Sequence, residues 1–232
     1  MHHDPKPPAP AHTAAPAALA GAGVHVVFAD TSLLVLNKPA GLLAVPGRGP
    51  HKQDCLSARA QAIYPDALVV HRLDMATSGL MLMARGTAMQ GALSRLFETR
   101  QIDKTYIAVV DGALPVDSAW QTIDAPIWAD WAARPLRRVD ARGQSSQTRW
   151  RCVQALGGQA PASRLVLQAL TGRSHQLRVH LQHLGHPILG DALYGQPLAA
   201  QRAPRLLLHA CGLEFVHPLT GQPMVFTQQP DF

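Results

Sequence analysis

The sequence contains few cysteines. Cys55, Cys152 and Cys211 occur among 232 residues, and they lie far apart without a CxxC pair. A disulfide framework requires an even set of cysteines, and a thiolate zinc site requires cysteines in pairs. The scattered set therefore argues against a disulfide-stapled secreted domain and against a cysteine zinc site. It favours a chain that stays reduced in the cytoplasm.

Other absences narrow the function classes further. No apolar run reaches the roughly 18 residues of a membrane-spanning helix, and the first residues lack the charged and apolar segments of a secretory signal. GAGVHV (21–26) has two glycines but lacks the third of a dinucleotide-binding GxGxxG, and the sequence has no Walker phosphate loop. We therefore expect no membrane association, no secretion, and no nucleotide or redox cofactor.

The composition predicts a folded, basic protein. Hydrophobic residues make up 47% of the chain, which is enough for a packed core. Lysine and arginine total 21 against 15 acidic residues, giving a formal charge of +6 and a pI near 9.7. A basic domain often binds a polyanion, and nucleic acid is the usual one. The alternative is surface charge that serves solubility alone.

The texture of the chain changes near residue 24. Residues 1–23 are mostly Ala, Pro and Gly with His2, His3 and His12, a composition that cannot bury enough apolar surface to fold. We predict that this extension is disordered and that residues 24–232 form one domain. Metal capture by the three histidines is the alternative role for the extension. No obligate protein partner is indicated, and the size suits a monomer.

Hydrophobic periodicity after residue 23 predicts both strands and helices. Apolar runs bounded by turn residues predict strands at 24–29, 33–36, 68–70, 80–84, 104–110, 164–170, 206–208 and 213–216. Three-to-four spacing predicts helices at 57–63, 87–100 and 175–184, and residues 114–147 are expected to be rich in loops. Because βαβ alternation is missing, we expect an α+β fold with a mixed, largely antiparallel central sheet flanked by helices and loops.

The stretch HRLDMATSGL (71–80) has a carboxylate between two apolar strands. Loops held by rigid strands often carry catalytic groups, so Asp74 is a candidate. The alternative is that Asp74 caps backbone N–H groups in a tight turn. Arg72 could pair with Asp74 or point outward to a phosphate or base, and His71 could be a general base or a hydrogen-bonding partner.

This stretch resembles the active-site motif of the RluA family of pseudouridine synthases. Four further segments resemble family motifs in the same order: VLNKPAGLLAVPG (35–47), KTYIAVV (104–110), LTGRSHQLRVHLQHLGHPILGDALYG (170–195), and RLLLHA (205–210) with HPLTG (217–221). The resemblance runs from about residue 25 to 232. It implies the pseudouridine synthase fold, with a catalytic cleft across the sheet, and isomerisation of uridine within RNA without a cofactor or metal.

The resemblance also implies residue roles. Asp74 would be the nucleophile, Tyr106 would stack on the uracil and assist proton removal, and Arg178 would pair with Asp74. A core aromatic and a surface helix arginine are the alternatives for Tyr106 and Arg178. Because no acid in the motifs other than Asp74 is an obvious partner, and Asp191 falls in a turn after the helix, isomerisation is favoured over hydrolysis.

The RNA partner and its contacts are further expectations. The target base must leave its stack, and Arg72 is our candidate to fill the vacated space. Other expected RNA contacts are His71, Thr77, Lys38, Lys104, Arg173, His175, Gln176, Arg137 and Arg138. The resemblance implies a 23S rRNA hairpin and the anticodon loop of tRNA as substrates. The alternatives are other rRNA uridines and a non-catalytic RNA-binding role.

Two further patterns invite a function. Six arginines between residues 134 and 151 accompany one acid, Asp140, and suit phosphate contacts, with a solvated loop as the alternative. The histidines of HLQHLGH (180–186) resemble a zinc motif but lack the glutamate of HExxH, so we expect no metal.

Overall fold

The computed structural model describes residues 23–129, 132–158 and 160–232. The predictions for the N-terminal extension, disorder and metal capture by its histidines, concern residues that lie outside these ranges, apart from Gly23.

The first half of the chain alternates strands with two helices. In order these are β1 (His25–Ala29), β2 (Leu33–Lys38), the short 3-10 helix η1 (Pro50–Lys52), α1 (Leu56–Ile63), β3 (Ala67–Val69), β4 (Ser78–Arg85), α2 (Thr87–Glu98) and β5 (Asp103–Asp111). The second half contains β6 (Gln121–Asp124), β7 (Ile127–Trp128), β8 (Arg138–Val139), β9 (Gln147–Leu156), β10 (Ala162–Ala169), α3 (Gln176–His183), α4 (Pro197–Gln201), β11 (Leu208–Val216) and β12 (Pro223–Thr227).

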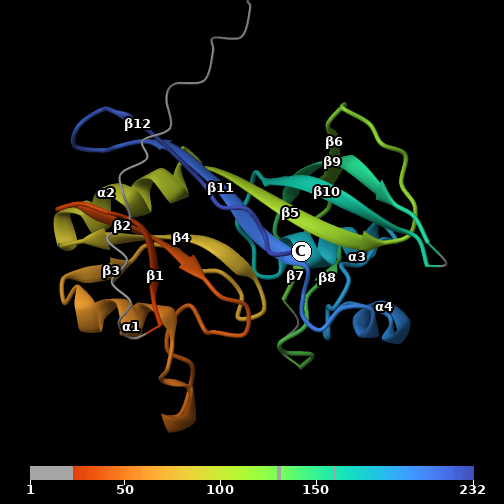
Figure 1. Ribbon diagram of the computed structural model, residues 1–232, viewed down its shortest axis with the longest axis horizontal. Coiled ribbons are helices and arrows are strands. Elements are labelled where there is room, and N and C mark those ends of the chain that lie inside the picture. Colours follow the sequence, from red (N-terminus) through yellow and green to blue (C-terminus); the bar gives the residue numbers. More distant parts are fainter. Residues whose placement is uncertain (1–22, 130–131, 159) are drawn as a thin grey trace, which may run out of the picture.

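One ten-stranded sheet organises the molecule. Its order is β1-β2-β4-β11-β5-β10-β9-β6, with β3 paired to β4 and β12 paired to β11, while β7 and β8 form a separate pair. All its pairings are antiparallel except β4 with β11. Figure 1 shows β11 and β5 in the middle, with α1 and α2 on one side and α3 and α4 on the other. The predicted α+β class and largely antiparallel sheet are confirmed.

The parallel contact between β4 and β11 requires a glycine. Gly79 lies opposite Ala210 with φ of 113°, and a Cβ on it would come within 2.3 Å of the Ala210 carbonyl oxygen. A larger residue would force the strands apart. This close approach fixes the exit of the 71–77 loop, because β4 begins at Ser78.

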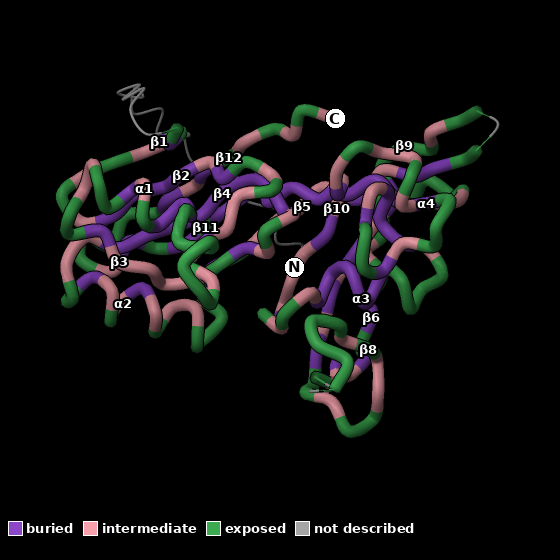
Figure 2. Tube along the Cα trace, turned by 90° about the horizontal axis from the view of Figure 1, so that it is seen from below, coloured by how far each residue is buried: buried purple, intermediate pink, exposed green. Residues whose placement is uncertain are grey.

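The core lies on both faces of the sheet. Leu34 and Leu36 of β2 pack with α1, whereas the alternate residues Leu33 and Val35 pack with α2, which explains why β2 is apolar almost throughout. In the other half, Leu177 and Leu181 anchor α3 in the core, and this tethering brings the start of α3 to the centre of the molecule. Figure 2 shows the buried residues concentrated along the strands and α3.

Several predicted elements need correction. The expected strand at 213–216 is the second half of β11, which begins at residue 208, where the other expected strand ends, and whose register shifts between Ala210 and Gly212. That irregularity interrupts the apolar pattern and hid the continuity of the strand. β9 was not predicted because its arginines and glutamines mask the alternation of buried Thr148, Trp150 and Cys152. α4 and β12 were also not predicted.

Candidate active site

A cavity of about 620 Å³ opens where the two halves of the sheet meet. Its walls come from the 71–77 loop, the end of α2, the start of β5, the 169–173 turn and the start of α3. Of the residues predicted from the sequence it brings together His71, Arg72, Asp74, Thr77, Lys104, Tyr106, Arg173, His175, Gln176 and Arg178. Lys38, Arg137 and Arg138 lie outside the cavity wall.

A buried lysine holds the loop that carries Asp74 through hydrogen bonds. The Lys38 ammonium is fully buried and donates to the carbonyl oxygens of Pro39 (2.9 Å), Leu42 (2.7 Å) and Met75 (3.0 Å). Burial lowers the pKa of Lys38 to about 8, although the charge of Asp74 acts in the opposite direction. The prediction that Lys38 contacts RNA is wrong, because its side chain is enclosed and all three of its donors are used.

Asp74 faces a buried arginine. The Arg178 guanidinium places NH1 3.3 Å from Asp74 Oδ2, and its Nε and NH2 donate to the two oxygens of Asp191 at 2.8 and 2.7 Å. The side chains of Arg178 and Asp191 are 5% and 0% exposed, whereas Asp74 is 21% exposed. One cation therefore joins a buried carboxylate to the carboxylate that reaches the cavity.

Electrostatics keep this buried pair charged. Burial acts to lower the pKa of Arg178, but its hydrogen bonds and charge contacts with Asp191 and then Asp74 raise it overall. Burial acts to raise the pKa of Asp191, but hydrogen bonds from Arg178 and the backbone N–H groups of Leu193 and Tyr194 lower it overall. A charged Arg178 is thus available to orient Asp74.

Sequence reasoning missed Asp191. It was taken for a turn residue without a site partner, but the chain after α3 folds back and buries it against Arg178. A signal was available: an acid between Gly190 and the apolar ALY segment, inside the segment 170–195 that resembles a family motif. Because Asp191 is fully engaged by Arg178, it is not free to act as a second hydrolytic carboxylate.

Tyr106 lies on β5 and lines the cavity while packing against the core. Burial, followed by the nearby charge of Asp74, raises the pKa of its phenol well above the ordinary value. The neutral phenol suits stacking and hydrogen-bond donation. Proton removal by a phenolate is correspondingly disfavoured in the free protein.

His71 supports the cavity wall. The Leu82 backbone N–H donates to His71 Nε2 at 2.8 Å, and the imidazole stacks on Phe97 with ring centres 4.4 Å apart. Burial, helped by the charge of Lys104, lowers the pKa of His71 to about 3, so the ring is neutral. This arrangement favours the hydrogen-bonding alternative over a general base.

The Gln176 amide is enclosed. Its oxygen accepts from the Thr171 hydroxyl (2.7 Å) and the Arg173 backbone N–H (3.1 Å), and its nitrogen donates to the Gln147 carbonyl (2.9 Å) and the Thr148 hydroxyl (3.0 Å). With both donors and the acceptor used, Gln176 joins the turn before α3 to β9. These hydrogen bonds give Gln176 a structural role in the cavity wall, and its contact with RNA stays a prediction.

The rim of the cavity is cationic. Arg72 is exposed, Lys104 and Arg173 are half-buried, and Thr77 is buried in the turn that Asp74 begins. The pKa of Lys104 is lowered, mainly because its ammonium group is partly buried. These cations suit the backbone of an entering polyanion.

The six arginines divide into two groups. Arg137 lies in residues 132–137 before β8 (the β7–β8 segment), and Arg138 is the first residue of β8, where its Nε lies 3.3 Å from Asp140 Oδ2. By contrast, Arg149 and Arg151 on β9 lie over the Trp120 ring at 5.0 and 4.9 Å. Phosphate contact by these arginines stays a prediction.

The histidines of HLQHLGH do not converge. His180 contacts the Thr148 hydroxyl and the Ala125 carbonyl, both at 2.9 Å, and His186 Nδ1 contacts the Asp111 carbonyl at 2.8 Å. Across residues 23–129, 132–158 and 160–232, no group of three His, Cys, Asp or Glu side chains could hold a metal ion. In the same ranges, no helix is long and apolar enough to cross a membrane.

Comparisons with known proteins agree with one another. Residues 32–183 match the family model described as RNA pseudouridylate synthase. Proteins called dual-specificity RNA pseudouridine synthase RluA from Yersinia pestis and Escherichia coli (strain K12) are each 44% identical over 208 residues, covering 89% of this chain and 99% and 93% of theirs. The Vibrio vulnificus protein of that name is 46% identical over 199 residues, covering 84% of this chain and 78% of its own.

Solved structures show the same similarity. Human RNA pseudouridylate synthase domain containing 1 superimposes with a TM-score of 0.76 at 27% identity, covering 91% of this chain and 85% of that one. Human RNA pseudouridylate synthase domain containing 4 gives 0.67 at 26% identity, covering 90% and 89%.

Proposed function

This chain belongs to the RNA pseudouridylate synthase family, and we propose that it isomerises uridines in a 23S rRNA hairpin and in the anticodon loop of tRNA. Relatives that align over nearly their whole length are named dual-specificity enzymes, which supports two RNA substrates. An enzyme acting on these RNAs would work in the cytoplasm, and a single copy carries every residue that we assign to the reaction.

The observation that carries the residue assignment is the arrangement of Asp74, Arg178 and Asp191. Pseudouridine forms when the C1′–N1 glycosidic bond breaks, the uracil turns and C5 bonds to C1′. We assign the nucleophile or its equivalent to Asp74, whose carboxylate reaches the cavity 3.3 Å from Arg178. Arg178 would keep this carboxylate ionised and oriented, and Asp191 would hold Arg178 in place. Attack at C1′, attack at C6 and a glycal route all remain compatible with this geometry.

The uracil would enter the cavity after leaving its stack. Unstacking a base costs a few kcal/mol, so contacts must replace the lost stacking. Tyr106 supplies a neutral ring beside Asp74, and exposed Arg72 at the rim could stack in the vacated position.

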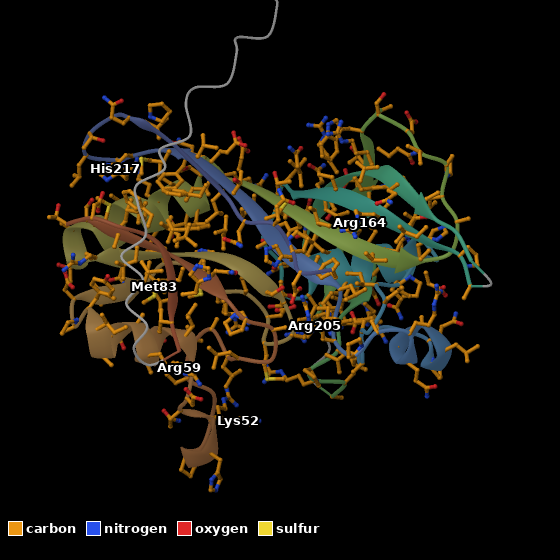
Figure 3. All side chains as sticks on the ribbon, viewed as in Figure 1. Lys52, Arg59, Met83, Arg164, Arg205 and His217 are labelled. Atoms are coloured by element: carbon orange, nitrogen blue, oxygen red, sulfur yellow. The ribbon has the colours of Figure 1, made fainter. Side chains whose placement is uncertain are left out.

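A basic surface would hold the rest of the RNA. Basic side chains also occur in residues 132–139 and in η1, where Lys52, labelled in Figure 3, lies on a segment that projects from the molecule. Desolvation, then the like charges of Arg48 and Arg137, lowers the pKa of Arg134, so these basic side chains act on one another electrostatically. Such a surface favours loop shape over duplex sequence.

The test is a two-substrate assay without metal or nucleotide. Purified protein is incubated with unmodified anticodon stem-loop and 23S hairpin transcripts, and pseudouridine is mapped at nucleotide resolution beside Asp74→Asn. We expect product on both RNAs with the parent and none with the variant. Product on one RNA would narrow the specificity, and product with Asp74→Asn would remove Asp74 from its role. Release of free uracil would indicate a hydrolase, and binding without product on any RNA would indicate a binding factor.

A further inference from the structure

The residue before α3 has an uncommon backbone conformation. His175 has φ of 58°, in the left-handed region that residues other than glycine adopt only uncommonly. Strain of this kind persists only where surrounding contacts hold it, and it is frequent at functional sites. Here it brings the imidazole to the cavity wall beside Asp74.

Hydrogen bonds around Tyr194 determine which ring nitrogen of His175 carries the proton. The Arg137 backbone N–H donates to the Tyr194 oxygen at 2.9 Å, and that hydroxyl lies 2.6 Å from His175 Nδ1. Within the described ranges of the chain the hydroxyl has no further hydrogen-bond partner, so its proton goes to Nδ1. Nδ1 is then an acceptor, and the neutral ring carries its hydrogen on Nε2.

His175 Nε2 faces the carboxylate. It lies 3.9 Å from Asp74 Oδ1, while Arg178 NH1 lies 3.3 Å from Oδ2, so each oxygen faces a different donor. Arg178 is already bound by Asp191 through two hydrogen bonds. His175 is the donor that can still approach, because 3.9 Å is longer than a hydrogen bond and leaves a gap to close.

The same contacts reach a surface loop. Arg137 lies in the segment between β7 and β8, and Tyr194 packs with Ile127 of β7 and Val179 of α3. Residues 132–137 of this segment are mostly exposed and carry basic side chains, and Figure 2 shows exposed residues next to β8. A shift of the Arg137 backbone would therefore act directly on the Tyr194 hydroxyl.

We propose that His175 is a positioning residue for Asp74, that Tyr194 keeps the hydrogen of the His175 ring on Nε2, and that RNA bound at Arg137 and Arg138 adjusts this pair through the Arg137 backbone. RNA binding would bring Nε2–H within hydrogen-bond distance of Asp74 Oδ1. The carboxylate would then be held by one donor on each oxygen during the reaction. This inference rests on the proposed role of Asp74.

Two substitutions at residue 175 separate the donor from the fold. His175→Asn keeps an amide near Nδ1 and tolerates positive φ, but it lacks a group at the position of Nε2. His175→Gln can place an amide N–H near that position, although its backbone is less suited to positive φ. We expect the single-turnover rate to fall about 10- to 100-fold in His175→Asn and less than about fivefold in His175→Gln, with RNA dissociation constants within about threefold of the parent.

A spectroscopic measurement tests the tautomer without any turnover. Nitrogen-15 histidine spectra of the free protein, assigned by comparison with His175→Asn, should show hydrogen on Nε2 of His175. Addition of the anticodon stem-loop should shift this signal in the parent but not in Tyr194→Phe, because that variant cuts the link to Arg137. Equal shifts in both proteins would contradict the coupling to the loop.

Failure of the proposed role of His175 can be told apart from failure of the proposed function. Parent-like turnover by His175→Asn, or a loss in His175→Gln as large as that in His175→Asn, would overturn the positioning role. Hydrogen on Nδ1 in the free protein would overturn the contact with Tyr194. A parent that forms no pseudouridine on either RNA would count against the proposed substrates, and the spectrum would still decide the tautomer.

Discussion

At the scale of single residues, two buried cations set the state of the Asp74 loop. Lys38 donates to the carbonyl of Met75 directly after Asp74, and Arg178 approaches the Asp74 carboxylate itself. Both are removed from water, which strengthens their interactions and makes their loss costly. Asp74 is thus held in two ways: Lys38 fixes the backbone next to it, and Arg178 contacts its carboxylate.

Replacing Asp191 should lower both stability and activity, whereas replacing Asp74 should lower activity alone. Asp191→Asn leaves the buried Arg178 without its main counter-charge, so we expect a loss of about 3 kcal/mol in the free energy of unfolding and a much lower single-turnover rate. Asp74→Asn, at a partly exposed position, should abolish turnover with a stability change within about 1 kcal/mol. Urea unfolding and single-turnover assays measure both. Parent-like activity in Asp191→Asn would contradict the role of Asp191 in orienting Arg178.

Lys38 should make the free energy of unfolding increase as the pH rises from about 8 toward 10.5. Its pKa is about 8 in the folded protein and 10.5 by its ordinary value, so between these pH values the unfolded chain holds more protons. Stability then increases with pH, by about 1 kcal/mol per pH unit from this group. Guanidinium unfolding at pH 7, 8, 9 and 10 should show this slope in the parent and not in Lys38→Met. Parallel pH profiles for the two proteins would disprove the linkage.

Arg72 should matter most where a base must leave a helix-flanked stack. Arg72→Ala removes an exposed rim side chain, so folding should be unaffected. We expect a larger loss of turnover on a duplex-flanked loop than on a flexible single strand, because only the former needs its stack refilled. Equal losses on the two RNAs would argue against stacking by Arg72.

At the scale of elements, the β4–β11 contact holds the site together. This parallel pair places the strand that leaves the Asp74 loop beside β11, and β11 in turn pairs with β5, which carries Tyr106. The residues of the site come from several elements, so their spacing depends on strand pairing rather than on any local turn.

Gly79→Ala should break this arrangement. Its Cβ would meet the Ala210 backbone, and its φ of 113° disfavours any side chain, so we expect a loss of at least about 3 kcal/mol in unfolding free energy. Gly91→Ala is the matched control, because Gly91 is exposed on α2 and a Cβ there meets nothing within 4 Å. That control should gain about 0.5–1 kcal/mol. A Gly79→Ala protein as stable as the parent would contradict the close approach.

At the scale of the whole molecule, charge is distributed unevenly. Cations lie at the cavity rim and at Arg137 and Arg138, while Arg149 and Arg151 of β9 lie over the Trp120 ring. RNA binding should therefore depend on salt through the first group rather than the second.

Salt dependence of RNA affinity tests this division. Replacing Arg137 and Arg138 together by alanine should reduce the slope of log K against log salt concentration by about 1.4 to 1.8, since two phosphate contacts are lost. Both replacements retain the Arg137 backbone N–H. Arg149→Ala/Arg151→Ala is the control with the same charge change, and it should leave the slope close to that of the parent. Equal slopes for the two double variants would refute the assignment.

The sequence by itself determined the family, the α+β class and the cluster of Asp74, Tyr106 and Arg178, because ordered motifs and local apolar periodicity carry that information. It also placed most strands and all three long helices to within a few residues. The sequence did not predict that β11 is continuous, because a register shift interrupts its apolar pattern. It did not predict β9, because polar side chains hide the alternation of its buried residues.

Only the tertiary structure decided which polar side chains are enclosed and what they contact. A motif lysine or glutamine has the same sequence signal whether it meets RNA or backbone carbonyls, yet Lys38 and Gln176 are buried and fully hydrogen-bonded. Arg178 and Asp74 are 104 residues apart in sequence, and Asp191 joins them only because the chain after α3 folds back. Burial and partner choice depend on such long-range packing, so local pattern cannot determine them.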